Sequence, residues 1–542
     1  MNQNWIAGRF VLFVAAIALV VATIGCGQPM AILDMFLNPS SDEFDQEPAD
    51  TDQNTPRLDA ENSGVDEPKS KAADLVKDWD KPTFAIFFTG RQHGYMEPCG
   101  CTGLSNQKGG MMRRHSSLKV LADRGWDVIK IDSGDQVERF GQQGLIKLGK
   151  TFESMCQIMN YDVIGLGIGD LKVPSIDLAQ SMMNANQGIN PFVCANIEVV
   201  DPDLSQRFRM IEKNGKRIGI TMVLGDEFLP ELAGVDGITA MPAATGLTQV
   251  IPLMDAQKCD VKILVAASSL ENCRVLAKKF PGFDLLITSG SPGDPTLQAE
   301  AIETGAKTTS MVQVGVKGMY VGIVGFFEKS GKMEIKYERV PLDDRFEDSA
   351  EVKQVFIRYQ DELKRLWESG QLADIQPRPH PSGHQFVGSD SCADCHEDEF
   401  QIWSEGNSGD GGPHQHATAS LTNPNERSWV QRNFDPECVS CHMTGWNPQG
   451  FFPYESGFRD IKKDDALFNN GCENCHGPGS AHIDAERNKK NDEKLLSKLR
   501  DDLRVTVEQA RTSTCVQCHD LDNSPDYVKE GGFDKYWPEI EH

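Results

Sequence analysis

The sequence is poor in positive charge. Its 542 residues include 54 Lys and Arg against 80 Asp and Glu, so the formal net charge at pH 7 is −26, and the isoelectric point is about 4.9. A surface of this charge repels the phosphates of nucleic acids and of anionic lipids, which excludes nucleic acid as a partner class. Basic proteins are the partners that such a surface attracts.

The sequence also lacks an apolar run long enough to be assigned to a membrane-spanning helix. One extended run, from Phe10 to Ile24, follows Arg9, and its length is typical of a signal peptide. Gly25-Cys26-Gly27 comes next and resembles the lipobox of bacterial lipoproteins. We therefore expect residues 1–26 to be a lipoprotein-like signal peptide, with Cys26 lipidated and the mature chain anchored to a membrane. An uncleaved anchor and an ordinary signal peptide are the alternatives, and all three imply export to the bacterial periplasm or cell envelope.

A complete disulfide framework is missing as well. Eight of the 15 cysteines recur in four similar pentads, and the other seven cannot all pair with one another. These seven are Cys26, Cys99, Cys101, Cys156, Cys194, Cys259 and Cys273. The last four lie in or beside apolar segments, and we expect them to be buried thiols without a chemical role.

The sequence does contain the pattern Cys-x-x-Cys-His four times in its last third. The first and second cysteines and the histidine of each copy are Cys392, Cys395 and His396; Cys438, Cys441 and His442; Cys472, Cys475 and His476; and Cys515, Cys518 and His519. This spacing is the attachment signature of c-type haem, in which two thiols bind the porphyrin and the histidine binds the iron. Zinc sites and disulfides also use paired cysteines, but they do not explain the histidine that follows every second cysteine. We predict four covalently bound haems whose proximal ligands are these four histidines.

The residues around the pentads resemble the tetrahaem cytochrome c-552/c-554 family. The resemblance begins at Phe386–Cys392, includes Trp403 and His416-Ala417, and continues through Cys438–Gly445 and Cys472–His482. The ending, Tyr536–His542, matches as well. Because porphyrins supply much of the apolar core, we expect residues 384–542 to be mainly α-helical and irregular, with haems close enough for electron hopping.

The sixth ligand of each iron decides between electron transfer and catalysis. A second histidine saturates the iron, whereas an open position admits a substrate. The resemblance points first to His416, His482 and His542 as distal ligands, with His384 or His414 as a fourth. It also implies that most of the irons carry two histidines and that one is five-coordinate.

The composition changes twice before the pentads. Residues 27–81 are polar and acidic, with ten carboxylates between Asp42 and Glu67, and such a segment predicts a flexible linker. In residues 82–370 short apolar runs alternate with helical patterns, which predicts a largely parallel sheet with helices packed outside it. An amphipathic helix at Glu351–Trp367 ends this part, and residues 371–383, rich in proline, predict a second linker.

The polar residues that follow these strands resemble the motifs of the metallophosphoesterase fold, and of 5′-nucleotidases in particular. Thr89–Gly94 stands where that family has its first metal motif, and Asp132–Asp135 matches the second. The resemblance implies an α/β sandwich. Arg91, however, replaces a ligand aspartate, and Ile168-Gly169-Asp170 replaces the Asn-His-Glu motif. Only His93, Asp132 and Asp135 remain as metal-ligand candidates, so we expect a domain that no longer hydrolyses phosphoesters.

One cluster in this domain has two interpretations. Pro98-Cys99-Gly100-Cys101 places two thiols one residue apart, which makes a strained disulfide but a workable pair of soft-metal ligands. Arg113 and Arg114 lie downstream and could lower a thiol pKa or hold an anion. Cys99 and Cys101 therefore form either a metal, redox or anion site or a purely structural loop.

The sequence as a whole predicts an exported, lipid-anchored tetrahaem cytochrome. Electrons would pass through the four haems to redox partner proteins of the cell envelope, and the nucleotidase-like domain would dock a partner or bind a small ligand or a metal ion. The main alternative is an oxidoreductase whose one open haem acts on a small nitrogen or sulfur compound. A metallophosphoesterase is the third possibility.

Overall fold

The computed structural model of the protein describes residues 75–98, 108–139, 141–186, 188–291, 293–305, 307–409, 411–423, 429–520 and 523–542. Cys26, most of the acidic segment, Cys99 and Cys101 lie outside these ranges. All the described residues belong to one compact unit. None of the helices they form is long and apolar enough to cross a bilayer.

The first sheet has five strands in the order β13-β12-β1-β2-β3. They are β1 (Phe84–Thr89), β2 (Val128–Asp132), β3 (Val163–Ile164), β12 (Tyr320–Lys329) and β13 (Lys332–Pro341). β1, β2 and β3 are parallel, whereas β12 pairs with β1 in the antiparallel direction. Every residue of β1 is buried, as expected of a central strand that is covered on both faces.

The second sheet has six strands in the order β10-β11-β9-β8-β6-β5. They are β5 (Phe208–Lys213), β6 (Lys216–Leu224), β8 (Val261–Ser269), β9 (Leu285–Gly290), β10 (Glu300–Glu303) and β11 (Thr308–Gln313). The four central strands are parallel. The short strands β4 (Ile197–Val199) and β7 (Ile238–Ala240) pair separately.

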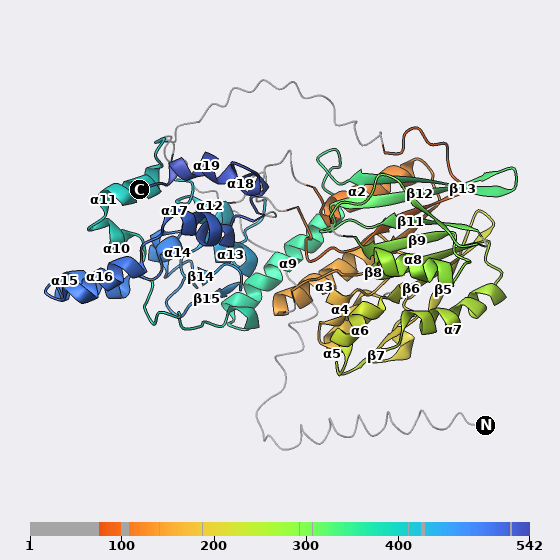
Figure 1. Ribbon diagram of the computed structural model, residues 1–542, viewed down its shortest axis with the longest axis horizontal. Helices are drawn as coiled ribbons and strands as arrows, with labels where there is room; N and C mark the ends of the chain where they lie inside the picture. The colour runs from red at the N-terminus through yellow and green to blue at the C-terminus, as the bar shows by residue number, and fades with distance from the viewer. Residues whose placement is uncertain are drawn as a thin grey trace, which may run out of the picture. The chain divides into compact units, whose positions relative to one another are not determined.

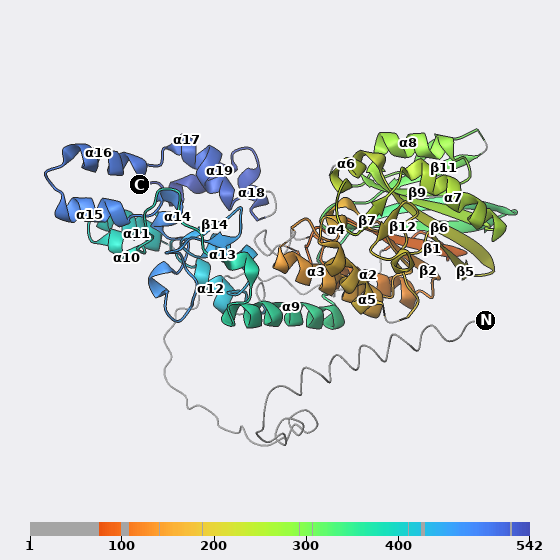
Figure 2. The same ribbon diagram turned by 90° about the horizontal axis from the view of Figure 1, so that it is seen from below.

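Seven helices accompany these sheets in the described part of the α/β domain. They are α2 (Met111–Asp123), α3 (Gln142–Glu153), α4 (Ile168–Leu171), α5 (Ser175–Ala185), α6 (Leu229–Leu232), α7 (Ala243–Ala256) and α8 (Leu270–Lys279). One apolar core contains residues of both sheets and of α2, α3 and α5, and a second core lies between the second sheet and helices α7 and α8. Ile263 and Val265 of β8 belong to the first core, and Leu264 and Ala266 to the second, as the alternation along a strand requires. Figure 2 shows α8 and the pair α2 and α5 on opposite sides of the sheets. The predicted α/β sandwich is therefore confirmed.

Helix α9 (Ala350–Glu368) follows the sandwich. The Ser349 hydroxyl caps its first turn by accepting a hydrogen bond from the Val352 N–H. Its buried side chains recur every three or four residues and include Phe356, Tyr359 and Leu363. This helix corresponds to the amphipathic helix predicted at Glu351–Trp367.

The cytochrome part is built from short helices joined by irregular segments (Figure 1). The helices are α10 (Asp390–Ala393), α11 (Glu397–Glu405), α12 (Ala417–Thr422), α13 (Pro436–His442), α14 (Cys472–His476), α15 (Ser480–Asn488), α16 (Glu493–Asp502), α17 (Val507–Gln509), α18 (Pro525–Val528) and α19 (Gly532–Tyr536). Strand structure among the described residues is limited to the hairpin β14 (Trp446–Asn447) and β15 (Phe452–Pro453). The mainly helical and irregular fold predicted here is confirmed.

Candidate haem sites

Short helical turns bring the two cysteines of a pentad onto one side of the backbone. α13 ends at His442 and α14 spans the third pentad from Cys472 to His476. Residues three and four apart lie on the same helix face, so a turn of this kind directs both thiols and the histidine toward one ring. The fourth pentad forms a 3₁₀ turn at Cys515–Gln517 instead.

Hydrogen bonds orient the ring nitrogens of three pentad histidines. Nδ1 of His442 lies 2.9 Å from the Ala417 carbonyl oxygen, and Nδ1 of His476 lies 2.7 Å from the carbonyl oxygen of Leu503. Nδ1 of His519 lies 2.8 Å from the Ser524 hydroxyl. An Nδ1–H that donates to such an acceptor leaves Nε2 with its lone pair, which is the arrangement a metal ligand needs.

Three pentad histidines face a second imidazole from a distant part of the chain. The ring centres are 6.3 Å apart for His396 and His482, 5.7 Å for His476 and His542, and 6.0 Å for His519 and His414. An imidazole nitrogen binds a transition metal at about 2 Å, so two rings on opposite sides of one iron have centres roughly 6 Å apart. The residues present therefore fit a haem iron at three of the four pentads.

The histidine of the second pentad, His442, differs from the other three. Among the described residues no second imidazole makes a ring contact with His442. His416 is exposed and borders the same cavity as His442, while His384 lies in the segment before the first pentad, close to His380. Of the five distal candidates, the structure thus brings His414, His482 and His542 opposite a pentad histidine.

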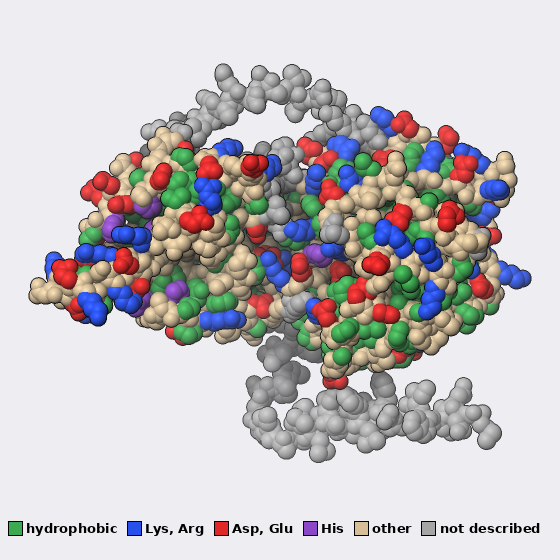
Figure 3. Space-filling model, in the orientation of Figure 1, with side chains coloured by type: hydrophobic (Ala, Val, Ile, Leu, Met, Phe, Trp, Pro, Cys, Tyr) green, Lys and Arg blue, Asp and Glu red, His purple; other side chains and the backbone are tan. Residues whose placement is uncertain are grey.

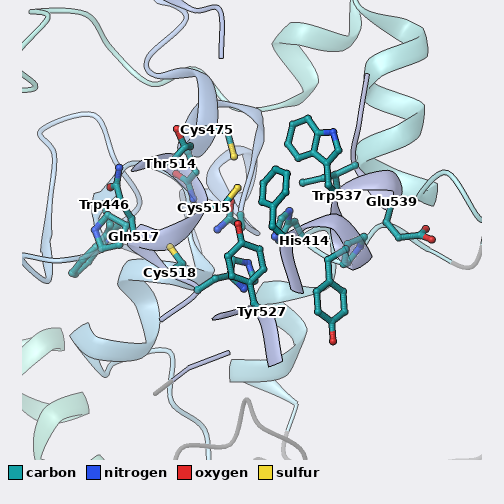
Figure 4. A pocket seen from close by; sticks show the side chains of 18 residues that line it. His414, Trp446, Cys475, Thr514, Cys515, Gln517, Cys518, Tyr527, Trp537 and Glu539 are labelled. Carbon is teal, nitrogen blue, oxygen red and sulfur yellow. The ribbon is translucent and has the colours of Figure 1, made fainter. Parts of the chain in front are cut away.

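The pocket at the fourth pentad is lined by aromatic rings. Figure 4 shows His414, Cys515, Cys518, Tyr527 and Trp537 around one hollow, whose volume is about 190 Å³. Burial lowers the pKa of His414 to about 4. The ring is therefore neutral at pH 7, the form that binds a metal. An apolar wall with one neutral imidazole facing another suits a porphyrin and its iron.

Thiols of different pentads lie next to one another. The Cys392 and Cys472 thiols lie close enough to shift each other's pKa, and the Cys441 thiol lies close enough to Cys518 to raise the pKa of Cys518. Cys475 lies close enough to Cys515 for that thiol to contribute to the raised pKa of Cys475, after burial as the larger cause. The attachment points therefore follow the spatial order first, third, fourth and second pentad.

The second pentad borders a larger cavity of about 720 Å³. The cytochrome side of its wall contains Cys438, Cys441 and His442 of the second pentad, together with His414, Cys518 and His519 at the fourth. The opposite side comes from the α/β domain: the segment His93–Pro98 after β1, residues 137–139, and side chains of α3 and α9. The volume lies within the range of roughly 300–1,000 Å³ that is usual for ligand sites.

Asp435 joins the two sides of this cavity. The carboxylate is buried and caps α13, and it accepts hydrogen bonds from Gln143 of α3 at 2.6 Å and from Gln360 of α9 at 2.9 Å. The Tyr359 hydroxyl lies 3.3 Å away. Nearby, Glu437 is paired with Lys147 at 2.5 Å.

The second metal motif of the α/β domain is closed by the chain's own side chains. Asp132 is completely buried, and its carboxylate accepts hydrogen bonds from Thr89 at 2.5 Å and from Gln136 at 2.6 Å. The buried guanidinium of Arg114 lies 3.5 Å from the same carboxylate. The Arg114 guanidinium is thus a fixed cation beside the Asp132 carboxylate.

His93 and Asp135 come from neighbouring loops. The His93 backbone N–H donates to the Asp135 carbonyl oxygen at 3.1 Å, and both residues adopt a positive φ. Burial lowers the pKa of His93 to about 4, although its ring lies 3.6 Å from Glu138. Within the described residues, no group of three or more His, Cys, Asp or Glu side chains is arranged to hold a metal ion. Cys99 and Cys101 belong to the part of the chain that is not described.

Two site residues were not anticipated from the sequence. Glu473, buried inside the third pentad, accepts N–H hydrogen bonds from Gly388 at 2.7 Å and Gly479 at 2.8 Å, and so ties the start of the cytochrome part to its centre. Asp435 is the second residue that was not anticipated. The Asp435-Pro436 pair is a common helix-start signal, so α13 was open to prediction, whereas its contacts with α3 and α9 were not.

The attachment pentads and the imidazoles that face them define a c-type cytochrome domain. Residues 391–477 match the family described as cytochrome c554 and c-prime, so the cytochrome part of this chain contains a domain of that family. Cytochrome c-554 of Nitrosomonas europaea is 26% identical over 175 residues, which cover 29% of this chain and 67% of that protein.

Among solved structures, the α/β part is similar to nucleotidases. The 5′-nucleotidase precursor of Thermus thermophilus aligns with a TM-score of 0.45 and 15% identity over 62% of this chain and 66% of its own. The NAD nucleotidase of Haemophilus influenzae aligns with a TM-score of 0.45 and 14% identity over 63% of this chain and 68% of its own. The chain thus spans about two thirds of the length of these proteins.

Proposed function

We propose that the protein is an exported c-type cytochrome that transfers electrons through four covalently bound haems. The observation that carries this proposal is the set of three imidazole pairs, each with the ring separation that one iron requires. Bound haem supplies one-electron chemistry, and two axial histidines favour electron transfer over substrate binding. The protein's own part is to hold the rings in place and to exclude water from them.

The neighbouring thiols support one continuous electron path. The first pentad adjoins the third, the third adjoins the fourth, and the fourth adjoins the second. Electrons would enter or leave at the first and the second pentad, which are the two ends of this path. Histidine side chains reach the molecular surface in Figure 3, and redox proteins of the cell envelope would dock near such an edge.

The α/β domain would serve as a docking or covering module without hydrolase activity. A two-metal hydrolase needs free carboxylates and imidazoles for its ions. The Asp132 carboxylate instead receives Thr89 and Gln136 and lies beside Arg114, which supports this assignment. A robust metal-dependent nucleotidase activity of the purified protein would contradict it.

We also propose that the chain is anchored in the bacterial cell envelope through a lipid on Cys26. The apolar run before Cys26 supports this proposal. Cells grown with a radioactive fatty acid should label the wild-type protein and not the Cys26→Ala variant. Label on both proteins, or on neither, would rule out the anchor.

Haem quantitation together with EPR of the oxidised protein tests the central proposal. We expect four covalent haems per chain, of which three give low-spin signals. Cys472→Ala with Cys475→Ala should lower the count to three. Fewer than four haems in the wild type would contradict the proposal.

A second candidate function rests on His442. Because no imidazole among the described residues faces this ring, its iron would be open to an exogenous ligand. The adjoining cavity, which Cys438 and Cys441 also line, would hold the haem of this pentad. A high-spin EPR signal from one haem in four would support an oxidoreductase that acts on a small nitrogen or sulfur compound, and a wholly low-spin spectrum would exclude it.

A further inference from the structure

The cavity beside His442 is built by two domains. Nδ1 of His442 points toward α12, because it contacts the Ala417 carbonyl oxygen at 2.9 Å and the Ser420 hydroxyl at 3.0 Å. Nε2 is on the other side of the ring and therefore faces away from α12. His93 and Glu97, which follow β1 in the α/β domain, line the same cavity as His442.

The α/β segment is held firmly in this position. Gly94 donates its N–H to the Gln136 carbonyl oxygen at 2.7 Å, and Met96, which is buried, belongs to the same apolar core as Phe356 of α9. Glu97 accepts a hydrogen bond from Arg432 of the cytochrome part at 2.8 Å. The wall that the α/β domain provides is therefore a fixed part of the site.

The charged groups around the cavity are unequal in number. Within the described residues, five carboxylates line it, and they belong to Glu97, Glu138, Asp435, Glu437 and Asp520. Three permanent cations line it too, and they belong to Arg139, Lys147 and Arg432. The cations are already engaged, since Arg139 and Lys147 pair with Glu437 at 3.1 Å and 2.5 Å and Arg432 pairs with Glu97.

One carboxylate oxygen near the cavity is buried without a hydrogen-bond partner. Oε1 of Glu97 receives Arg432, whereas Oε2 is buried and has no hydrogen-bond partner. The side chain is 15% exposed, so its charge is only partly screened by solvent. Because five carboxylates face three cations, an anion that entered the cavity would meet an excess of negative charge.

We propose that the α/β domain closes the iron site of the second pentad and that Glu97 makes this site selective for a small neutral ligand over an oxyanion. The inference rests on the second candidate function, in which the iron at His442 is open. Ligands of the proposed class are uncharged molecules of two or three heavy atoms, or a neutral imidazole as a probe. Glu97 is a specificity-determining residue in this scheme and has no part in electron transfer.

Titrations of the oxidised full-length protein test the proposal. Imidazole, which is mostly neutral at pH 8, and azide, an anion, are added separately while the Soret band and the high-spin EPR signal are followed. We expect imidazole to bind at the high-spin haem and azide to bind much more weakly than it does at a free haem peptide. Glu97→Gln should strengthen azide binding by about tenfold, because a unit charge roughly 10 Å away acts through an effective dielectric of about 20. It should leave imidazole binding unchanged.

Matched controls separate this effect from a change in folding. Glu198 pairs with Arg207 at 2.7 Å elsewhere in the α/β domain, so Glu198→Gln removes a similar carboxylate away from the cavity and should change neither affinity. His93→Asn provides a second readout: asparagine tolerates the positive φ of this position, and the smaller side chain should speed imidazole entry several-fold. His380→Asn is the control for this variant, because His380 does not line the cavity.

Each outcome decides one question. Equal azide affinities for Glu97→Gln and Glu198→Gln would overturn the role of Glu97, and an unchanged entry rate in His93→Asn would overturn the closure by the α/β domain. A spectrum with four low-spin haems would overturn the whole inference and leave the electron-transfer proposal intact. A haem count below four would contradict that proposal separately.

Discussion

Arg114 and Asp132 form a charged pair in the interior of the α/β domain. Both side chains are completely buried, and their nearest charged atoms are 3.5 Å apart. A buried carboxylate is costly unless it is hydrogen-bonded and paired with a cation. The guanidinium is thus one reason why the Asp132 carboxylate is stable in the interior of the domain.

Arg114→Met should destabilise the fold by about 3–5 kcal/mol, because it leaves the Asp132 carboxylate without its cation. The measurement is the midpoint of urea unfolding followed by circular dichroism. Lys119→Met is the control, because Lys119 lies on the same helix, α2, and pairs with Glu351 at the protein surface. This variant should leave the unfolding midpoint nearly unchanged. Equal shifts for the two variants would contradict the role of Arg114.

Two histidines only two residues apart provide a second test at the residue scale. The His414 ring faces His519, whereas His416 is exposed and faces no pentad histidine among the described residues. His414→Ala should therefore convert one low-spin haem to high spin, because the iron loses its sixth ligand. His416→Ala should leave the EPR spectrum of the oxidised protein unaltered. The opposite pattern would assign the ligand role to His416.

At the scale of elements, α13 connects the second pentad to the α/β domain. Its capping carboxylate, Asp435, receives side chains from α3 and α9 in addition to the Glu437 N–H of its own helix at 3.1 Å. One side chain therefore fixes the start of the helix and also the contact between the two parts of the chain.

Asp435→Ala should lower the unfolding free energy by about 2–4 kcal/mol, since it removes a helix cap and leaves buried amide donors without an acceptor. Asp492→Ala is the matched control, because Asp492 caps α16 in an exposed position and makes only the local hydrogen bond to Leu495. That variant should lose about 1 kcal/mol. Denaturant titration of both variants gives the comparison, and similar losses would show that the cap alone matters.

The parts of the fold that depend on local pattern were predictable. β1 and β2 are short apolar runs with a polar end, the pattern that predicts a buried strand. The similar short run Phe192–Cys194 forms only isolated bridges, at Phe192 and Val193. Helix α7 is harder to predict, because Gly246 and Pro252 within it weaken the helical signal.

The attachment points of the candidate site were also predictable, whereas the imidazoles that face them were not. Each pentad is a local pattern of five residues and identifies its own attachment point. The imidazole that faces it comes from a distant segment, so neither spacing nor composition distinguishes His414 from His416. The wall formed by His93 and Glu97 depends on how two folded parts pack together, which no short stretch of sequence encodes.

The whole molecule carries a strong negative charge, and this charge should govern its encounters. With a formal charge of −26, oxidation of the reduced protein by a small basic cytochrome should slow at least tenfold between low and high ionic strength. An acidic cytochrome should react faster as salt is added. Stopped-flow rates measured over a salt series check both trends, and rates independent of salt would show that docking does not use this charge.

The contacts across the second haem cavity have a kinetic consequence. The hydrogen bond between Gln143 and Asp435 joins residues 292 positions apart, and that between Glu97 and Arg432 joins residues 335 positions apart. Contacts so distant in sequence form late in folding, because the chain must close a long loop before they stabilise anything. The cavity at His442 is thus among the last features to be completed, after the C-terminal part of the chain has been made. A chain that fails late in folding would keep the three imidazole pairs, which form earlier, and would lose only the cavity at His442.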